Sequence, residues 1–408
     1  MTGLIFLSAL HEQRRLVTML VASVLVCTAV IGLRQWQGLE ALELAAYDWC
    51  LNHQKVTSAT PSPIVVIAVS EDDLRRQGGW PLRDEIIAQA LRLLEQQRSR
   101  VIGLDMFRDL PVPPGTDMLA DVLKRNSNIV VVTQASGGTQ SRVPPPQAVA
   151  GTDQVGFADV TVDRDGVVRR GLLFLEDGNT TLSSFALQVA LGYLQREGIV
   201  RQPGYTDPQQ LRLGEVTIPP LESDDGGYVA VDAHGYQFLL DFQRAATFFT
   251  TFSLTSLVTG EVPSAALRDQ IVLLGITAES VKDFFVIPYR SLHQPRQRIP
   301  GVVLQAYMVD QLLRFARQGT TPIVTSRETQ EWGWVALWSL FGGVLAIRFA
   351  SPFWFFFVVG SGIVALAAMG YGAFLYRWWI PVVPAVLGWS LSAIVVRILC
   401  VPWQMEDV

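Results

Sequence analysis

The chain has 408 residues, of which 50% are hydrophobic and only 17% are charged, and its formal net charge at pH 7 is −5. Soluble domains carry roughly 25% charged residues, so the deficit, which is concentrated at the two ends of the chain, indicates membrane segments there. Nucleic acid is excluded as a partner because the chain has no basic run to neutralise phosphates. At about 150 residues per domain, the middle has room for one large or two modest folded units.

Four apolar runs have the length expected of transmembrane helices, which need roughly 20 residues. The first covers residues 16–33 and is followed by LRQWQG instead of a small-residue cleavage site, so we expect an uncleaved anchor. The other three cover residues 332–347, 352–376 and 378–399 and are separated only by very short loops. We therefore predict four transmembrane α-helices, with the last three in an up-down series.

Basic residues near the spans set the orientation. Arg14 and Arg15 precede the first span, and Arg348 and Arg397 lie at later positions on the same side of the membrane. On the opposite side there are only single basic residues at the span ends, Arg34 and Arg377. The balance favours both termini in the cytoplasm of a multi-pass protein of the plasma (inner) membrane. The expected order is a cytoplasmic tail (1–15), the anchor (16–33), an exported domain (34–330), three membrane helices (331–400) and a second short tail (401–408).

The spans themselves carry few signs of activity. Every arginine lies at or near a span end and no acid lies inside a run, so transport is a weak hypothesis. Gly342, Ala346 and Ala350 repeat on one helical face, which predicts close helix packing within the chain more readily than a homodimer contact. Of Cys27, Cys50 and Cys400, only Cys50 lies outside an apolar run, and a half-buried free thiol is favoured over a cross-link between two copies.

Between the spans, buried strands alternate with amphipathic helices. PIVVIAVSEDD (63–73), RVIGLDMF (100–107) and NIVVVTQ (128–134) are predicted strands, and helical patterns lie between them. QIVLLGITAE (270–279) is a further buried strand, and residues 299–317 form a closing helix that leads toward the second span. We predict an α/β exported domain with a mixed, largely parallel sheet.

Two stretches predict β-hairpins inserted into this sheet. Residues 155–177 contain two alternating strands that meet at Asp165-Gly166, and residues 227–242 form a second hairpin after a Pro- and Gly-rich surface excursion. A helix with a Thr cap is expected over residues 181–194. Asp163 and Asp165 lack the further oxygen ligands and closing Glu of a calcium loop, so they favour a turn, and no metal or cofactor is expected.

The order of these motifs resembles the CHASE domains of the second class. The resemblance rests on AAYDWCLNH, IVVIAVSEDDL with GGWPLRD, VIGLDMF, VGFADVTVDRDGVVRR with LSSFALQVA, LLGITAESVKDFFVIP and PGVVLQAYMVDQLL, in colinear order over about residues 42–313. It implies an extracellular sensory domain between one anchor and three membrane helices, normally followed by a cytoplasmic cyclase or kinase. The chain departs from the family pattern at Ser70, where an Asp is common.

Polar residues that follow predicted strands mark a candidate ligand site, because open α/β sheets bind ligands beyond the carboxyl ends of their strands. Ser70, Asp72, Asp105, Gln134 and Thr277 hold such positions, and two motif positions of the family should lie on adjacent loops: Arg83 and Asp283. An Arg among carboxylates is equally expected of a structural ion pair. Trp80 is as compatible with capping the core as with touching a ligand.

Common catalytic motifs are missing from the sequence. It has no G-x-S-x-G elbow, no H-E-x-x-H and no phosphate loop, and its histidines, His11, His53, His234 and His293, are scattered. We therefore predict a protein that is not an enzyme, although a carboxylate pair, Asp105 with Asp283, keeps hydrolysis open as an alternative. An anion site at Ser136 to Gly138 is less favoured than a simple loop.

These observations predict a membrane-anchored sensor that binds an unknown small molecule or protein outside and signals through its helices. The sequence as given places no output domain after the last span, so the expected signalling partner is a separate cyclase or kinase. A scaffold or accessory subunit that senses nothing is the main alternative, and an extracytoplasmic hydrolase is the second.

Overall fold

The structure is a computed structural model that describes residues 2–54, 61–135, 142–178, 180–243, 249–289, 296–349 and 351–400, with side chains from Glu12 onward. The chain divides into two compact units. A helical unit contains residues 1–53, Glu222–Asp232 and 323–408, and an α/β unit contains residues 54–221 and 233–322. The predicted sites Ser136–Gly138 and His293, and the side chain of His11, fall outside the described part.

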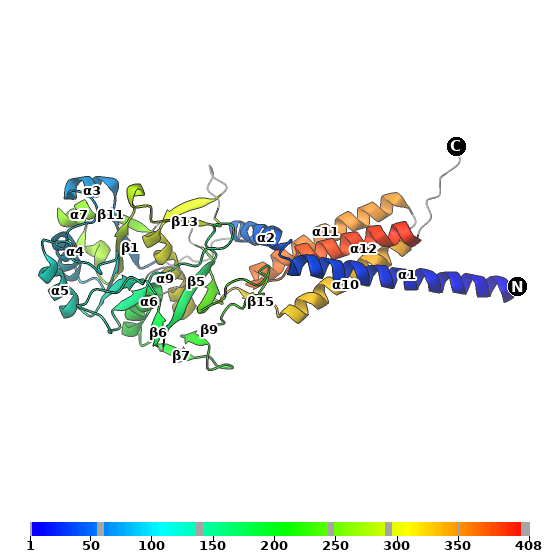
Figure 1. The fold of residues 1–408 in the computed structure, drawn as a ribbon, viewed down its shortest axis with the longest axis horizontal. Helices are drawn as coiled ribbons and strands as arrows, with labels where there is room; N and C mark the ends of the chain where they lie inside the picture. The colour runs from blue at the N-terminus through cyan, green and yellow to red at the C-terminus, as the bar shows by residue number, and fades with distance from the viewer. Residues whose placement is uncertain are drawn as a thin grey trace. The chain divides into compact units, whose positions relative to one another are not determined.

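A six-stranded parallel sheet forms the centre of the α/β unit (Figure 1). Its strands, in spatial order, are β11 (Thr250–Ser253), β1 (Ile64–Val69), β12 (Ile271–Ile276), β2 (Val101–Asp105), β3 (Ile129–Thr133) and β4 (Val155–Phe157). Each neighbouring pair is parallel. The central strands are continuous apolar runs because helices cover both faces of the sheet, so no strand residue needs to face water. The predicted largely parallel sheet is confirmed.

Two hydrophobic cores, one on each face of the sheet, make the unit three layers deep. On one face, α4 (Asp84–Gln96), α5 (Thr116–Arg125) and α7 (Leu254–Val258) pack against side chains such as Ile67 and Leu104. On the other face, α6 (Phe185–Leu194) and α9 (Gly301–Gln318) pack against the alternate side chains of the same strands. Short helices complete the unit: α3 (Glu71–Gln77), α8 (Ser264–Leu267), η1 (Gln195–Glu197) and η2 (Glu279–Val281).

Smaller antiparallel sheets are added to this core, so the antiparallel pairs lie in separate sheets and not, as a mixed sheet would require, within the main one. They are β10–β5–β6 (Tyr236–Leu239, Arg170–Asp177, Thr180–Ser183), β7–β8–β9 (Arg201–Pro203, Leu211–Leu213, Val216–Ile218) and β13–β14 (Phe284–Ile287, Gln297–Pro300).

The predicted hairpins differ in detail from those that form. The turn at Asp165-Gly166 is present, but β4 before it joins the main sheet beside β3, and β5 after it pairs with β10 and β6. The second predicted hairpin is wrong, because only its final strand, β10, forms. The helix expected from Thr181 begins at Phe185, because residues 180–183 pair with β5 and the side chain of Ser184 caps α6 instead.

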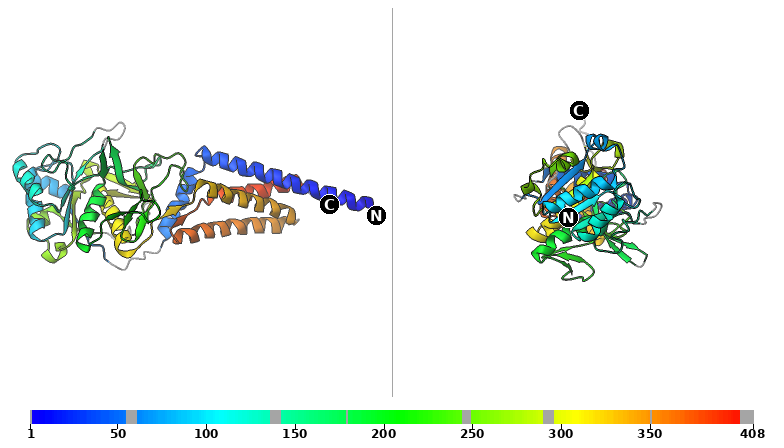
Figure 2. Two further views of the ribbon diagram at one scale, coloured as in Figure 1. Left: turned by 90° about the horizontal axis from the view of Figure 1, so that it is seen from below. Right: turned by 90° about the vertical axis from the view of Figure 1, so that its left-hand side faces the viewer.

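The helical unit contains α1 (Thr2–Gln35), α2 (Glu40–His53), α10 (Glu328–Arg348), α11 (Pro352–Leu375) and α12 (Val383–Cys400), with the short strands β15 (Val324–Thr325) and β16 (Trp378–Trp379). Its long helices run side by side (Figure 2). Small residues lie at the contacts: a Cβ on Gly342 of α10 would lie 2.2 Å from the Trp389 carbonyl oxygen of α12. The small-residue face therefore packs within the chain; Ala350 lies outside the described residues.

Three helices in the described part are long and apolar enough to cross a membrane: Glu12–Gln35, Pro352–Leu375 and Val383–Cys400. The prediction of four is corrected to three on this criterion. The helix α10 forms where the second span was expected, but Glu328 and Glu331 occupy its first turn and several tryptophans and glycines dilute its apolar stretch.

Candidate functional site

Four of the predicted site residues lie along the carboxyl edge of the parallel sheet. Asp105 ends β2, and Ser70, Thr277 and Gln134 directly follow β1, β12 and β3. This is the edge at which parallel α/β sheets bind ligands. The structure therefore places these four residues along one edge, whereas the sequence placed each of them only at the end of its own strand.

Several of these residues have structural partners. The side chain of Ser70 caps α3, where its hydroxyl accepts from the Asp73 N–H and its own N–H donates to Asp73 Oδ2 at 2.8 Å. Thr277 donates from its N–H and hydroxyl to the Val69 carbonyl at 2.9 and 3.3 Å, and so joins the ends of two strands. Gln134 forms an isolated β-bridge with Val143.

Two further predicted residues, Asp72 in α3 and Arg83 at the N-cap of α4, form ion pairs. Asp72 pairs with Arg75 at 3.0 Å, and both side chains are more than two-thirds exposed. Arg83, at the N-cap of α4, pairs with Glu85 at 3.0 Å. For Arg83 the structural ion pair is therefore the arrangement present. Trp80 is 42% exposed and lies beneath the Arg108 guanidinium.

Asp105 and Asp283 form the part of the edge with unusual electrostatics. Both are half-buried, and burial, followed by the nearby charge of Asp283, raises the pKa of Asp105 to about 8. Burial also raises the pKa of Asp283. Desolvation disfavours the charged form of both carboxyls, and the nearby charge of Asp283 adds to this effect at Asp105.

The acid pair lies against the first turn of α9. The Gly301 N–H donates to the Asp283 backbone carbonyl at 3.1 Å, and a Cβ on Gly301 would lie 2.4 Å from Asp283 Oδ2. Beside it, a Cβ on Gly275 of β12 would lie 3.3 Å from the Asp105 Cβ and 2.6 Å from the Val302 Cβ. The two glycines thus let α9 approach the sheet where the acids lie, and α9 has no side-chain cap at Pro300.

Sequence reasoning missed Asp73, which ties the same edge together. It is 1% exposed and accepts from the Thr255 N–H at 2.8 Å and hydroxyl at 2.6 Å, in addition to Ser70. Although burial opposes it, hydrogen bonds from Ser70 and Thr255 hold the pKa of Asp73 below its ordinary value. The sequence signal was available, because Ser70 and Asp73 have the spacing of a capping box.

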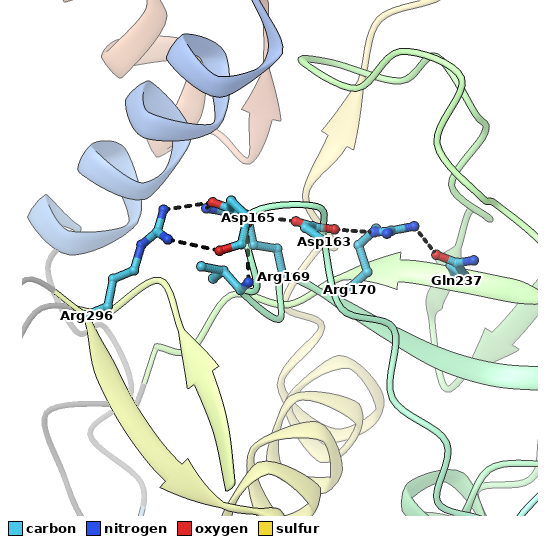
Figure 3. A network of polar contacts seen from close by, with 7 residues as sticks. Asp163, Asp165, Arg169, Arg170, Gln237 and Arg296 are labelled. Atoms are coloured by element: carbon cyan, nitrogen blue, oxygen red, sulfur yellow. Dashed lines mark hydrogen bonds and ion pairs between the residues drawn. The ribbon is translucent and has the colours of Figure 1, made fainter. Parts of the chain in front are cut away.

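A buried ionic network surrounds the Asp165-Gly166 turn (Figure 3). Arg169 is fully buried and donates to Asp163 at 2.8 Å and to Asp165 at 3.0 and 2.8 Å. Arg170 donates to the other oxygen of Asp163 at 2.8 Å, and Arg296 pairs with Asp165 at 2.7 Å. These arginines occupy the aspartate oxygens that a calcium ion would need, and the described residues contain no cluster of three or more metal-ligating side chains.

A separate hollow of about 860 Å³ lies on the α/β unit between α6, the β3–β4 edge and β6. Its lining includes Arg100, Asn128, Arg142, Thr181 and Gln188, and none of the seven predicted site residues. The predicted site and this hollow are therefore different places on the unit.

Comparison with known proteins gives one match. A family model described as the CHASE2 domain matches residues 24–344, which is most of the chain. Neither the curated proteins nor the solved structures gave a match. The match covers the sensory domain recognised from the sequence motifs, together with the sheet, the acid pair and α9. The chain therefore belongs to the CHASE2 domain family, a family of sensory domains.

Proposed function

We propose that the protein is a membrane-anchored sensor whose exported α/β unit binds its ligand at the carboxyl edge of the sheet and signals through α9. The observation that carries the proposal is the Asp105–Asp283 pair packed against the first turn of α9. Residues 319–327 connect α9 directly to α10, so a displacement of α9 acts on a helix of the helical unit. A coupling of about 1–3 kcal/mol between the two sites would suffice for regulation.

The helix α9 is suited to transmit such a displacement because buried ion pairs hold its second half. Its Arg314 donates to both oxygens of Asp241, at 2.9 and 2.6 Å, and to Asp310 at 3.0 Å, and all three side chains are buried. Asp310 also accepts from Ser62 at 2.7 Å. In this proposal α9 moves together with these partners when its N-terminal turn is displaced.

In this proposal the α/β unit lies outside the plasma (inner) membrane, and α10 is a fourth crossing beside the three apolar helices. Support comes from the packing of α10 along α1 and α12: Gly343 lies against Ser23 of α1, and Gly342 lies against Trp389 of α12. The charges of α10 are at its ends, Glu328 and Glu331 at one and Arg348 at the other. Charged ends on an apolar middle suit a helix held within a bundle.

The ligand would be a small molecule, a protein or the proton itself, and the partner a cyclase or kinase module of the kind associated with this family. Homodimerisation would be compatible with such a partner. The role is sensing and not catalysis, in keeping with the family.

Protons are the most direct probe of the acid pair. The full chain in lipid nanodiscs would be compared at pH 6 and pH 9 by hydrogen–deuterium exchange, corrected for intrinsic rates. We expect the first turn of α9 to change its protection with pH in the wild type and to lose that response in Asp105→Asn. Asp72→Asn, an exposed acid of the same edge, is the matched control and should keep it.

Two results would contradict the proposal. One is an α9 that responds identically in the wild type and in Asp105→Asn. The other is turnover of p-nitrophenyl esters or phosphate esters that depends on Asp105 and Asp283, which would favour a hydrolase. A wild type with no response, copurifying from membranes in a fixed structural assembly, would favour the scaffold.

A further inference from the structure

The segment Glu222–Asp232, which we name the anchor loop, belongs to the helical unit although the chain on both sides of it belongs to the α/β unit. It has no helix or strand, yet Tyr228, Val229 and Val231 are buried at 0%, 3% and 8% exposure. Loops normally run over the surface because their backbone groups need water. Because the anchor loop is buried, the helical unit must supply hydrogen-bond partners for its backbone groups.

Arg34 at the end of α1 supplies the main polar contact. It donates to the Gly226 carbonyl at 2.8 Å, and the same nitrogen pairs with Glu331 in the first turn of α10. Arg34 is 3% exposed and Glu331 is 1% exposed. The loop thus shares one buried guanidinium with the start of α10, and breaking a buried pair of this kind is strongly unfavourable because it leaves a charge uncompensated.

Apolar and aromatic contacts fix the tip of the loop. The Tyr228 ring meets the Trp379 ring edge-on at a centroid distance of 5.7 Å, and Trp379 packs in turn on Tyr47 of α2 at 4.6 Å. Cβ atoms on Gly226 and Gly227 would lie 2.5 and 2.8 Å from Trp379, so glycine is required at this approach. The loop therefore contacts α1 through Arg34, α2 through Glu43 and the α11–α12 connection through Trp379.

The base of the anchor loop is held inside the α/β unit by the network of Figure 3. Leu221, which precedes the loop, donates its N–H to the Gln237 carbonyl at 2.9 Å. The Gln237 side chain accepts from Arg170 at 2.7 Å and donates to the His234 carbonyl at 2.9 Å. Arg170 is also paired with Asp163. The buried ion pairs at the Asp165-Gly166 turn are therefore linked through Gln237 to residues on both sides of the loop.

We propose that the anchor loop is a second coupling element between the two units, in addition to the α9–α10 connection. A change in the α/β unit that shifts Gln237 would move the loop. The geometry of the ion pair between Arg34 and Glu331, at the start of α10, would then change. The physical basis is two sets of buried polar contacts that the backbone of the loop joins: Asp163 to Arg170 to Gln237 at the base, and Gly226 to Arg34 to Glu331 at the tip.

The test needs no ligand, no pH change and no substitution of the acid pair, so its failure is distinct from failure of the proposed sensor site. The full chain in nanodiscs would carry Gln237→Leu, and hydrogen exchange would be followed in the first turn of α10. The matched control is Gln154→Leu, since the Gln154 amide also makes several bonds in the same unit, to the Leu123, Asn126 and Ile129 carbonyls.

We expect Gln237→Leu to raise exchange at the start of α10 by about tenfold, whereas Gln154→Leu leaves it unchanged. In an Arg34→Gln background, where the tip is already released, Gln237→Leu should add nothing, because coupled sites are not additive. Equal effects of the two Gln→Leu changes, or additive effects of Gln237→Leu and Arg34→Gln, would overturn the proposal. Should Gln237→Leu unfold the α/β unit, Gln237→Asn shortens the same side chain while keeping its amide, and it is judged by the same outcomes.

Discussion

The carboxylate of Asp283 lies against Gly301, the first residue of α9, so closely that a Cβ on this glycine would come within 2.4 Å of Oδ2. An acid whose pKa is raised by burial thus sits where the connecting helix begins. Protonation or ligand binding at the acid would change the space and charge at the first turn of α9.

Gly301→Ala should destabilise the chain by about 1–3 kcal/mol, because the new methyl group and Asp283 cannot both keep their places. In a helix, Ala would otherwise be favoured over Gly by roughly 0.5–1 kcal/mol. The cost should therefore vanish or change sign in an Asp283→Ala background. Thermal unfolding of the four proteins in detergent measures this, and an equal cost in both backgrounds would show that the contact is not the cause.

Asp105 should make the wild type less stable as pH rises from about 4 to about 8. The folded protein keeps the Asp105 proton up to about pH 8, whereas the unfolded chain loses it near pH 3.9. In this window the folded state binds more protons, so the free energy of unfolding falls as pH increases. Asp105→Asn cannot titrate, and its melting temperature should fall less over the same range. Parallel pH profiles for the two proteins would refute the assignment.

Arg169→Ala should destabilise the protein by about 3–5 kcal/mol, because it removes a buried guanidinium from Asp163 Oδ2 and from Asp165 and leaves Asp163 to pair with Arg170. The Arg169 side chain is 0% exposed and Asp163 is 1% exposed. Arg75→Ala removes an exposed pair with Asp72 and should cost at most about 1 kcal/mol. Urea unfolding of both variants provides the comparison. Similar midpoints would mean that the network in Figure 3 contributes no more than a surface ion pair.

Asp73→Ala should cost about 2–3 kcal/mol, since it removes the reciprocal cap with Ser70 and the bonds to Thr255. The lowered pKa of Asp73 adds a signature in acid. A depressed carboxyl stabilises the fold above its unfolded pKa of about 3.9 and loses this contribution as pH falls through the folded value. The variant should lack that acid-dependent loss, and Asp72→Ala should behave as the wild type. A wild-type acid profile in Asp73→Ala would contradict the role assigned to this residue.

The sequence predicts the parallel sheet well, because β1, β2, β3 and β12 are short, continuous apolar runs rich in β-branched residues, which is typical of strands buried on both faces. It also predicts the carboxyl edge, because each polar residue there directly follows its strand. The pairing of Asp105 with Asp283 is suggested by the sequence, but their common burial beneath α9 depends on glycines in two distant elements.

Other features depend on contacts that no local pattern encodes. The place of β4 beside β3 is decided by burial in the main sheet, although a strong turn signal follows it. Gln237 and Arg296 join the network around Asp163 from far along the chain. The anchor loop has the composition of a surface excursion, and only the buried partners in the helical unit reveal its packing. The helix α10 falls outside the apolar criterion because its tryptophans and glycines lower the mean hydropathy of a run that the sequence pattern counts as apolar.

Site-directed labelling tests the central claim, that the α/β unit lies outside the membrane and that α10 crosses it. In a background with Cys27, Cys50 and Cys400 replaced by Ser, Asp153→Cys and Ser351→Cys would be exposed to an impermeant maleimide on intact cells. Both positions are exposed, one in the α/β unit and one between α10 and α11. The account predicts labelling at position 153 on intact cells and at position 351 only after permeabilisation. Labelling of both on intact cells would remove α10 as a crossing, and protection of position 153 would contradict the external location of the sensor.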